Sequence, residues 1–183
     1  MFALTGLLVV GLAYPPAQLT LGTLVATVVA NQMGGIAPDI DQSTAPFWRN
    51  LPLAGFLGKT VSRALGGHRF LTHSILGLVL TGFLTKMFLE FLHPIIPRID
   101  ITLVWWGFMI GIVSHLVIDS ISKEGVPWLL PLPYKFGFPP VRSWRLTTGE
   151  SVESFIVFPA LIIFNVAFAM THYRQILDIF HRM

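Results

Sequence analysis

The chain has 183 residues, of which 54% are hydrophobic and only 11% are charged, and its mean hydropathy is +0.71. Soluble domains carry roughly 25% charged residues, so this composition excludes an ordinary soluble domain and favours a membrane protein. The absence of cysteine excludes disulfides, thiolate zinc sites and cysteine nucleophiles, and the net charge of +3 is explained by cytoplasmic loops rather than by nucleic-acid binding.

Five apolar segments predict an all-α integral membrane protein, a bundle of four to five transmembrane helices with a metal site at one membrane face. Residues 1–183 are expected to form a single membrane domain. The first segment is short, because its twelve apolar residues span about 18 Å as a helix against roughly 30 Å of hydrocarbon. We expect it to be tilted behind its neighbours, or the natural chain to begin further upstream. In chain order the segments are residues 2–13, 17–36, 71–92, 101–121 and 151–170.

Polar stretches follow the second, fourth and fifth segments. Residues 37–70 predict a loop with a short amphipathic helix at 54–64, residues 122–150 a proline-rich loop, and residues 171–183 an amphipathic tail. The two loops hold eight lysines and arginines, whereas the opposite side of the membrane holds three. The positive-inside rule therefore predicts a multi-pass membrane protein with both long loops in the cytoplasm.

Carboxylates and imidazoles gather at the ends of these segments on the predicted cytoplasmic side. The i,i+4 pair His115 and Asp119 lies on one face of a membrane helix, the face that must look into the bundle. Oxygen and imidazole ligands without thiolates suit Zn²⁺ first, with Mn²⁺ or Fe²⁺ as alternatives. The sequence thus predicts a site for one or two divalent ions, whose expected ligands are Asp39, Asp41, His68, His73, His115 and Asp119.

Each part of this constellation also has a simpler explanation. An Asp-x-Asp after a helix suits a solvated turn, and His115 and Asp119 suit a hydrogen bond that joins two helices. The conjunction favours a metal, because ionisable groups inside a membrane bundle are costly and tend to be functional.

Three ordered motifs resemble the YdjM family. They are Pro38-Asp39-Ile40-Asp41, the G-H-R-x-x-T-H-S motif of residues 67–74, and the S-H-x-x-x-D-x-x-S-x-x-G motif of residues 114–125. The resemblance covers roughly residues 31–155 and implies a helical protein of the inner membrane, LexA-regulated and proposed to be a metal-dependent hydrolase. Family members commonly carry a histidine before the first helix. This chain has none before His68, so we expect either a missing ligand or a start further upstream.

These observations predict a membrane-bound metal-dependent hydrolase, a phosphoesterase that acts on a lipid or lipid-linked substrate at the cytoplasmic face. Glu150 or Glu153 is expected to complete the ligand set or to act as general base. Arg69, Arg142 and Arg145 are expected to hold phosphate, with ordinary loop charge as the alternative. The competing hypotheses are a metal-ion or proton transporter and a non-catalytic scaffold with a structural metal. The predicted partners are membrane lipids, without nucleic acid.

Overall fold

The computed structural model describes residues 1–45, 48, 54–66, 69–132, 134–145 and 153–183. All regular elements in these ranges are helical, which confirms the all-α fold, and the described ranges pair as strands only at one isolated bridge between Val126 and Phe136. In chain order the elements are α1 (Phe2–Ala13), α2 (Leu21–Ile36), the 3-10 turn η1 (Pro38–Asp41), α4 (Ala54–Ala64), α5 (Ile75–Leu92), α6 (Ile101–Ile121), the 3-10 turn η2 (Arg142–Trp144), the π turn η3 (Glu153–Val157), α7 (Phe158–Thr171) and α8 (Tyr173–His181).

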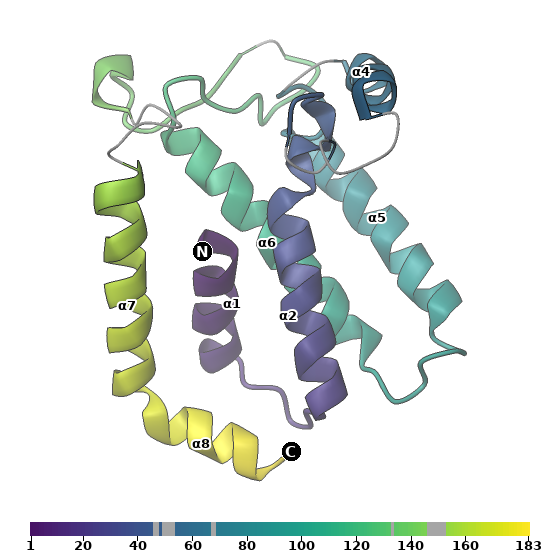
Figure 1. Ribbon diagram of the computed structural model, residues 1–183, viewed down its shortest axis with the longest axis vertical. Helices are drawn as coiled ribbons and strands as arrows, with labels where there is room; N and C mark the ends of the chain where they lie inside the picture. The colour runs from purple at the N-terminus through teal and green to yellow at the C-terminus, as the bar shows by residue number, and fades with distance from the viewer. Residues whose placement is uncertain (46–47, 49–53, 67–68, 133, 146–152) are drawn as a thin grey trace.

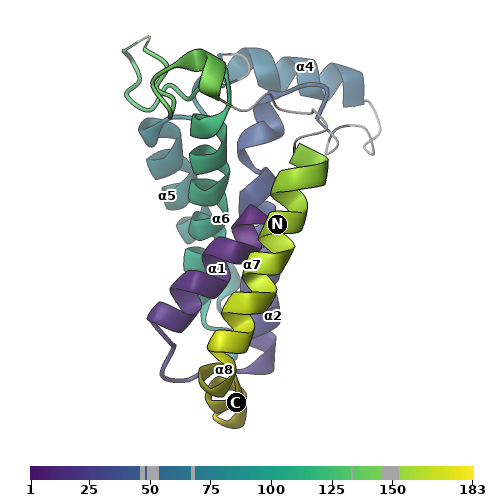
Figure 2. The same ribbon diagram turned by 90° about the vertical axis from the view of Figure 1, so that its left-hand side faces the viewer.

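The longer helices run along the bundle, and the two amphipathic helices lie across its ends. Helices α2, α5, α6 and α7 extend between the two ends, with α1 packed beside α2 and α6 (Figure 1). Helix α4 crosses the end where α2 finishes and α5 begins, and α8 turns away at the opposite end (Figure 2). This arrangement brings the segments that carry most predicted ligands to the same end.

Among the described residues, two helices are long and apolar enough to cross a membrane, namely α5 and α6. A third span results if η3 and α7 are counted with α8, from which they are bent by 68°. Helices α1 and α2 are apolar but shorter, so the expected four or five crossings stay a prediction for them. On α5 the side chains of Val79, Phe83, Met87 and Phe91, spaced four apart, are each more than half exposed. Such a stripe is stable only against lipid or another apolar partner.

Helices α2 and α6 approach each other through small residues. A Cβ atom on Gly111 of α6 would lie 2.2 Å from the carbonyl oxygen of Asn31 on α2. One turn earlier, a Cβ on Gly107 would lie 2.7 Å from the carbonyl oxygen of Thr27. The Asn31 amide also donates to the Gly107 carbonyl over 3.1 Å. Glycines four apart allow this close backbone contact, which fixes the register of the two helices.

Local capping sets where the helices begin. Thr20 caps α2 by accepting from the Thr23 amide, so this helix starts at Leu21 and not at residue 17 as expected. Ser74 caps α5 by accepting from the Gly77 amide, so α5 starts four residues later than the predicted residue 71. The residues just before α5 therefore form a turn, which leaves His73 outside the helix with its side chain buried in the bundle.

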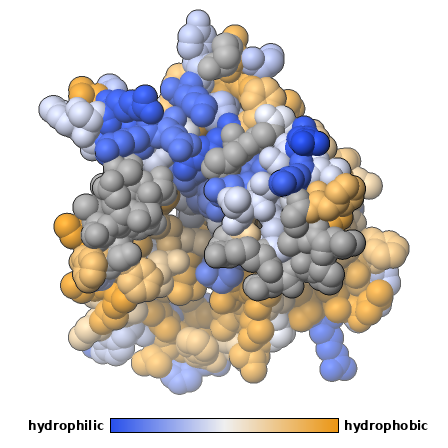
Figure 3. Space-filling view, turned by 45° about the horizontal axis from the view of Figure 1, so that its top comes forward, coloured by the Kyte–Doolittle hydropathy of each residue, from blue (hydrophilic) through white to orange (hydrophobic). Residues whose placement is uncertain are grey.

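The described part of the loop after α6 folds back over the end of that helix. Val126 is fully buried and pairs with Phe136 through two backbone hydrogen bonds of 2.8 Å. The Trp128 indole donates to Ser120 of α6, and the Trp128 carbonyl accepts from the Ile75 amide at the start of α5. The loop therefore ties the ends of α5 and α6 together on the polar side of the bundle. Polar residues gather on this end, while apolar residues cover the flanks (Figure 3).

Candidate metal centre

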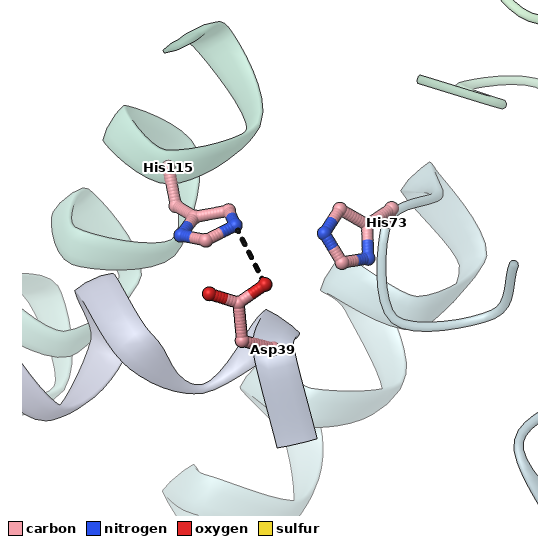
Figure 4. A group of neighbouring side chains, drawn as sticks. All are labelled: Asp39, His73 and His115. Carbon is pink, nitrogen blue, oxygen red and sulfur yellow. Dashed lines mark ion pairs between the residues drawn. The ribbon is translucent and has the colours of Figure 1, made fainter. Parts of the chain in front are cut away.

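Three chain segments meet where α2 ends, α5 begins and α6 ends. Asp39 lies in η1 directly after α2, His73 in the turn before α5, and His115 and Asp119 in the last two turns of α6. Figure 4 shows the two imidazole rings and the Asp39 carboxylate turned toward a common point. One ligand atom from each of these three residues lies within 4.8 Å of the others.

The tautomer of His115 is set by its surroundings. Its Nδ1 lies 2.7 Å from the carbonyl oxygen of Gly35, which can only accept, so Nδ1 carries the proton. Nε2 then presents a lone pair to the centre. Its nearest carboxylate oxygens are Oδ1 of Asp39 and Oδ2 of Asp119, both at 3.6 Å, and it makes no hydrogen bond within the described part of the chain.

His73 is oriented in the same way from the other side. Thr72 donates its hydroxyl proton to Oδ2 of Asp41, so the Nδ1 of His73 is the donor toward Thr72 (2.9 Å) and Asp41 (3.2 Å). Its Nε2 faces Oδ2 of Asp119 at 3.2 Å. Burial lowers the pKa of His73, but hydrogen bonds to Asp119 and Asp41 outweigh it, so the pKa is raised. In the absence of a metal, a proton on Nε2 of His73 lets this atom donate a hydrogen bond to Oδ2 of Asp119, so that two acceptors no longer face each other.

The spacing of these atoms suits a bound ion. The three measured separations between imidazole Nε2 and carboxylate oxygen atoms are 3.2, 3.6 and 3.6 Å. Metal–ligand bonds of about 2.1 Å in tetrahedral geometry place neighbouring ligand atoms about 3.4 Å apart. The donor chemistry and these three separations are therefore compatible with a bound divalent ion.

Arg69 holds the second oxygen of Asp119. Its guanidinium lies 3.1 Å from Oδ1 of Asp119 and 2.8 Å from the Ser122 hydroxyl, and the residue is only 5% exposed. Its backbone N–H donates to Oδ2 of Asp41 over 2.9 Å, with a φ of 56° that a non-glycine residue adopts at a cost. One strained residue thus positions both Asp41 and Asp119.

Three carboxylates gather at the centre, those of Asp39, Asp41 and Asp119. Arg69 contacts two of them, because its guanidinium lies 3.1 Å from Asp119 and its backbone N–H donates to Asp41. The other neighbour of the guanidinium is the exposed Glu124 at 3.5 Å. A group of carboxylates beside two imidazoles is a donor set that could hold a metal ion.

The structure brings together four of the six predicted ligands: Asp39, His73, His115 and Asp119. Asp41 is fully buried behind His73, where it accepts from Thr72, His73 and the Arg69 backbone. His68, Glu150 and the side chain of Glu153 lie outside the described residues, so the expectations for them stay predictions.

The three predicted phosphate-binding arginines occupy different settings. Arg69 is buried and paired with Asp119, as described above. Arg142 is exposed in η2 and donates to the Lys123 carbonyl at 3.2 Å. Arg145 donates to the carbonyls of Pro139 and Pro140 and so braces its own loop.

Several residues of the centre were missed by the sequence reasoning. Thr72 and Ser122 stand inside the quoted motifs and contact Asp41 and Arg69, respectively, so a signal for them was present. The Gly35 carbonyl has no side-chain signal, and only the packing of α2 against α6 brings it to His115.

Comparisons with known proteins agree with this architecture. The family model described as YdjM inner membrane protein matches residues 2–176, a longer range than the motifs alone suggested. YvsG of Bacillus subtilis (strain 168) is 30% identical over 133 residues, which cover 73% of this chain and 72% of that protein. The inner membrane protein YdjM of Escherichia coli (strain K12) is 29% identical over 132 residues, which cover 72% of this chain. The YdjM protein of Shigella flexneri gives the same values.

The match to the E. coli and S. flexneri proteins spans 60% of their length. No solved structure matches the chain significantly. The apolar helices and the family match together identify an inner-membrane type of protein. The chain belongs to the YdjM family of inner membrane proteins.

Proposed function

We propose that the chain is a metal-dependent hydrolase whose single divalent ion is held by Asp39, His73, His115 and Asp119. The observation that carries this proposal is the set of facing acceptors. The Nε2 atoms of both histidines and the near oxygens of both aspartates point at one another, and hydrogen bonds at Nδ1 orient both rings. Acceptors of this kind repel unless a cation lies between them.

The donor set favours zinc. Two imidazole nitrogens and two carboxylate oxygens form a borderline set that Zn²⁺ accepts in four-coordinate geometry, whereas Mg²⁺ and Ca²⁺ prefer oxygen alone. The carboxylate behind His73 and the carbonyl behind His115 are partners that metal-ligating histidines commonly have. Manganese and iron remain the alternatives for the same set.

The exposure of Asp39 supports a catalytic rather than a structural ion. Its side chain is 36% exposed, whereas those of His73 and Asp119 are 0% and 7% exposed. A structural zinc site is closed on all sides, and a catalytic one keeps a position for water or substrate. A divalent ion bound here lowers the pKa of coordinated water and polarises an ester. Asp39 then forms the open edge of the centre, on the side from which a substrate enters.

The position of the centre supports a lipid or lipid-linked phosphoester as substrate. His73 lies two residues before the span α5, and Asp119 lies in the last turn of the span α6. This position supports a centre at the depth of the headgroups, where the ester bonds of membrane lipids are found, rather than at the bilayer midplane that transport sites favour. The excess of cations in the long loops supports a cytoplasmic orientation of this end.

Metal analysis of the purified protein tests the ligand set. We expect about one ion per chain in the wild type, and strong loss of it in His115→Ala and in Asp119→Asn. His93→Ala is the matched control, because His93 follows α5 at the opposite end of the bundle. Retention of the ion in both site variants, or absence of stoichiometric metal from the wild type, contradicts the proposal.

Hydrolysis assays test the activity separately. Phospholipids, polyprenyl phosphates and nucleotides are offered to the wild type with and without chelator. We expect release of phosphate or of a phosphorylated headgroup from a lipid substrate, and its loss with chelator and in Asp39→Asn. Bound metal without activity toward any of these substrates would favour the structural-metal scaffold instead.

A further inference from the structure

Helix α4 presents a mixed apolar and cationic face away from the bundle. Phe56, Lys59 and Arg63 follow one another at spacings of three and four, so they share one side of the helix. Phe56 is 71% exposed, and Lys59 and Arg63 are exposed as well. No ion pair joins either cation to a carboxylate among the described residues.

The opposite side of α4 is docked on η1 and the residues that follow it. A Cβ atom on Gly58 would lie 3.2 Å from Ser43 and from the Trp48 ring, so the helix sits close on the chain that follows η1. The Trp48 indole in turn donates to the Ile40 carbonyl within η1 over 3.1 Å. The depth and orientation of α4 are therefore coupled to the turn that carries Asp39.

The direction of α4 matches a membrane surface. It lies across the end of the bundle, roughly perpendicular to the helices that run lengthwise (Figure 2). At the other end α8 repeats the pattern, with Tyr173, Leu177 and Phe180 about half exposed on one side and a bend of 68° from α7. Two amphipathic helices that bracket the apolar length of α5 and α6 mark the two interfaces of a bilayer.

We propose that α4 is an interfacial helix that binds anionic phospholipid headgroups on the side of the membrane where the metal centre lies. Phe56 inserts at the boundary of the acyl chains, and Lys59 and Arg63 bind lipid phosphates, which match cations that lack a described protein partner. The inference stands without the metal centre, because it rests on exposure, charge and the placement of α4. If both hold, lipid phosphates surround the open edge formed by Asp39.

Spin labels at single cysteines test the insertion, and the chain has no native cysteine to remove. Phe56→Cys is compared with Lys135→Cys, an exposed position in the loop at the same end. In lipid nanodiscs we expect dissolved oxygen to increase the relaxation rate of the label at 56. A water-soluble nickel chelate should have little effect on the same label. The label at 135 should behave in the opposite way.

Two results would overturn the insertion. A label at 56 that is as accessible to the chelate as the label at 135 shows that α4 faces water. Dipolar broadening between labels at 56 shows that a second copy of the chain covers this face instead.

The charge requirement is tested with the same label. Nanodiscs of phosphatidylcholine alone are compared with nanodiscs that contain phosphatidylglycerol. We expect chelate accessibility at 56 to fall at least about twofold with the anionic lipid, since cations near such a surface are attracted to it. Lys59→Gln with Arg63→Gln should abolish this difference, whereas Arg174→Gln with Arg182→Gln on the α8 side should keep it. Equal accessibility in both lipids refutes the headgroup preference.

Discussion

At the scale of single residues, the centre is a set of hydrogen-bond acceptors that face one another. The Nδ1 atoms of His73 and His115 are occupied by outer partners, which turns both Nε2 atoms toward Asp119. Such a group is stable with a metal ion or with a proton in its middle. The two cations therefore compete, and pH decides which of them binds.

The raised pKa of His73 determines how the stability of the metal-free protein changes with pH. In metal-free protein its pKa is raised, so the stabilisation by its proton is fully present below the ordinary pKa of about 6.5 and is lost as the pH rises through the folded-state value. We expect the stability advantage of the wild type over His73→Gln to shrink as the pH rises above about 6.5 in the presence of chelator. Thermal unfolding of both proteins measures it.

Added zinc should reverse this trend, because zinc must displace the same proton. The increase in Tm on adding zinc is expected to grow with pH in the wild type and to be small in His73→Gln. An increase that is independent of pH would show that His73 does not bind the metal.

The structure assigns Arg69 to the support of Asp119 rather than to free contact with phosphate. Arg69→Lys keeps the charge but loses the fork that reaches Asp119 and Ser122 together. We expect metal affinity to fall about 10- to 100-fold, as for other residues that hold a ligand in place. Competition with a chromophoric chelator measures it, and Arg142→Lys serves as control. Normal metal affinity with a raised KM would support the phosphate role instead.

At the scale of elements, the centre depends on the contact between α2 and α6. Gly107 and Gly111 let the two backbones meet, and this brings the Gly35 carbonyl within hydrogen-bond distance of His115. Any side chain at these glycines separates the helices, so stability and metal binding should change together.

Gly111→Ala tests this contact between α2 and α6. Its Cβ would lie 2.2 Å from the Asn31 carbonyl, so we expect a loss of about 1–3 kcal/mol from strain in a packed contact. Gly11→Ala is the matched control, because a Cβ at that position of α1 meets no atom within 4 Å. Unfolding in detergent with increasing sodium dodecyl sulfate measures both. Equal stability of the two variants would show that the contact between α2 and α6 is not tightly packed.

At the scale of the whole molecule, one end of the bundle carries the centre, α4 and the long loop, and the other carries α8 (Figure 1). The excess of lysine and arginine in the loops at the first end predicts that this end faces the cytoplasm. Under the proposed function, the orientation decides which leaflet would supply a lipid substrate.

Cysteine labelling in intact cells tests the orientation. Lys123→Cys follows α6 at the end of the centre, and Arg98→Cys lies between α5 and α6 at the opposite end. A membrane-impermeant maleimide should label the cysteine at 98 in intact cells and the one at 123 only after the membrane is opened. The reverse result would place the centre outside the cytoplasm.

The sequence by itself determined the apolar helices and the depth at which the acids and imidazoles lie, because hydropathy and i,i+4 spacing are local properties. The pairing of His115 with Asp119 follows from that spacing, and it is present in the structure. Only the tertiary structure decided the separate roles of Asp39 and Asp41. Two residues apart in one short turn, they point to different neighbours, because the turn before α5 brings Arg69 and Thr72 to Asp41 and leaves Asp39 facing His115. Contacts between distant segments make that choice, and local sequence patterns do not contain them.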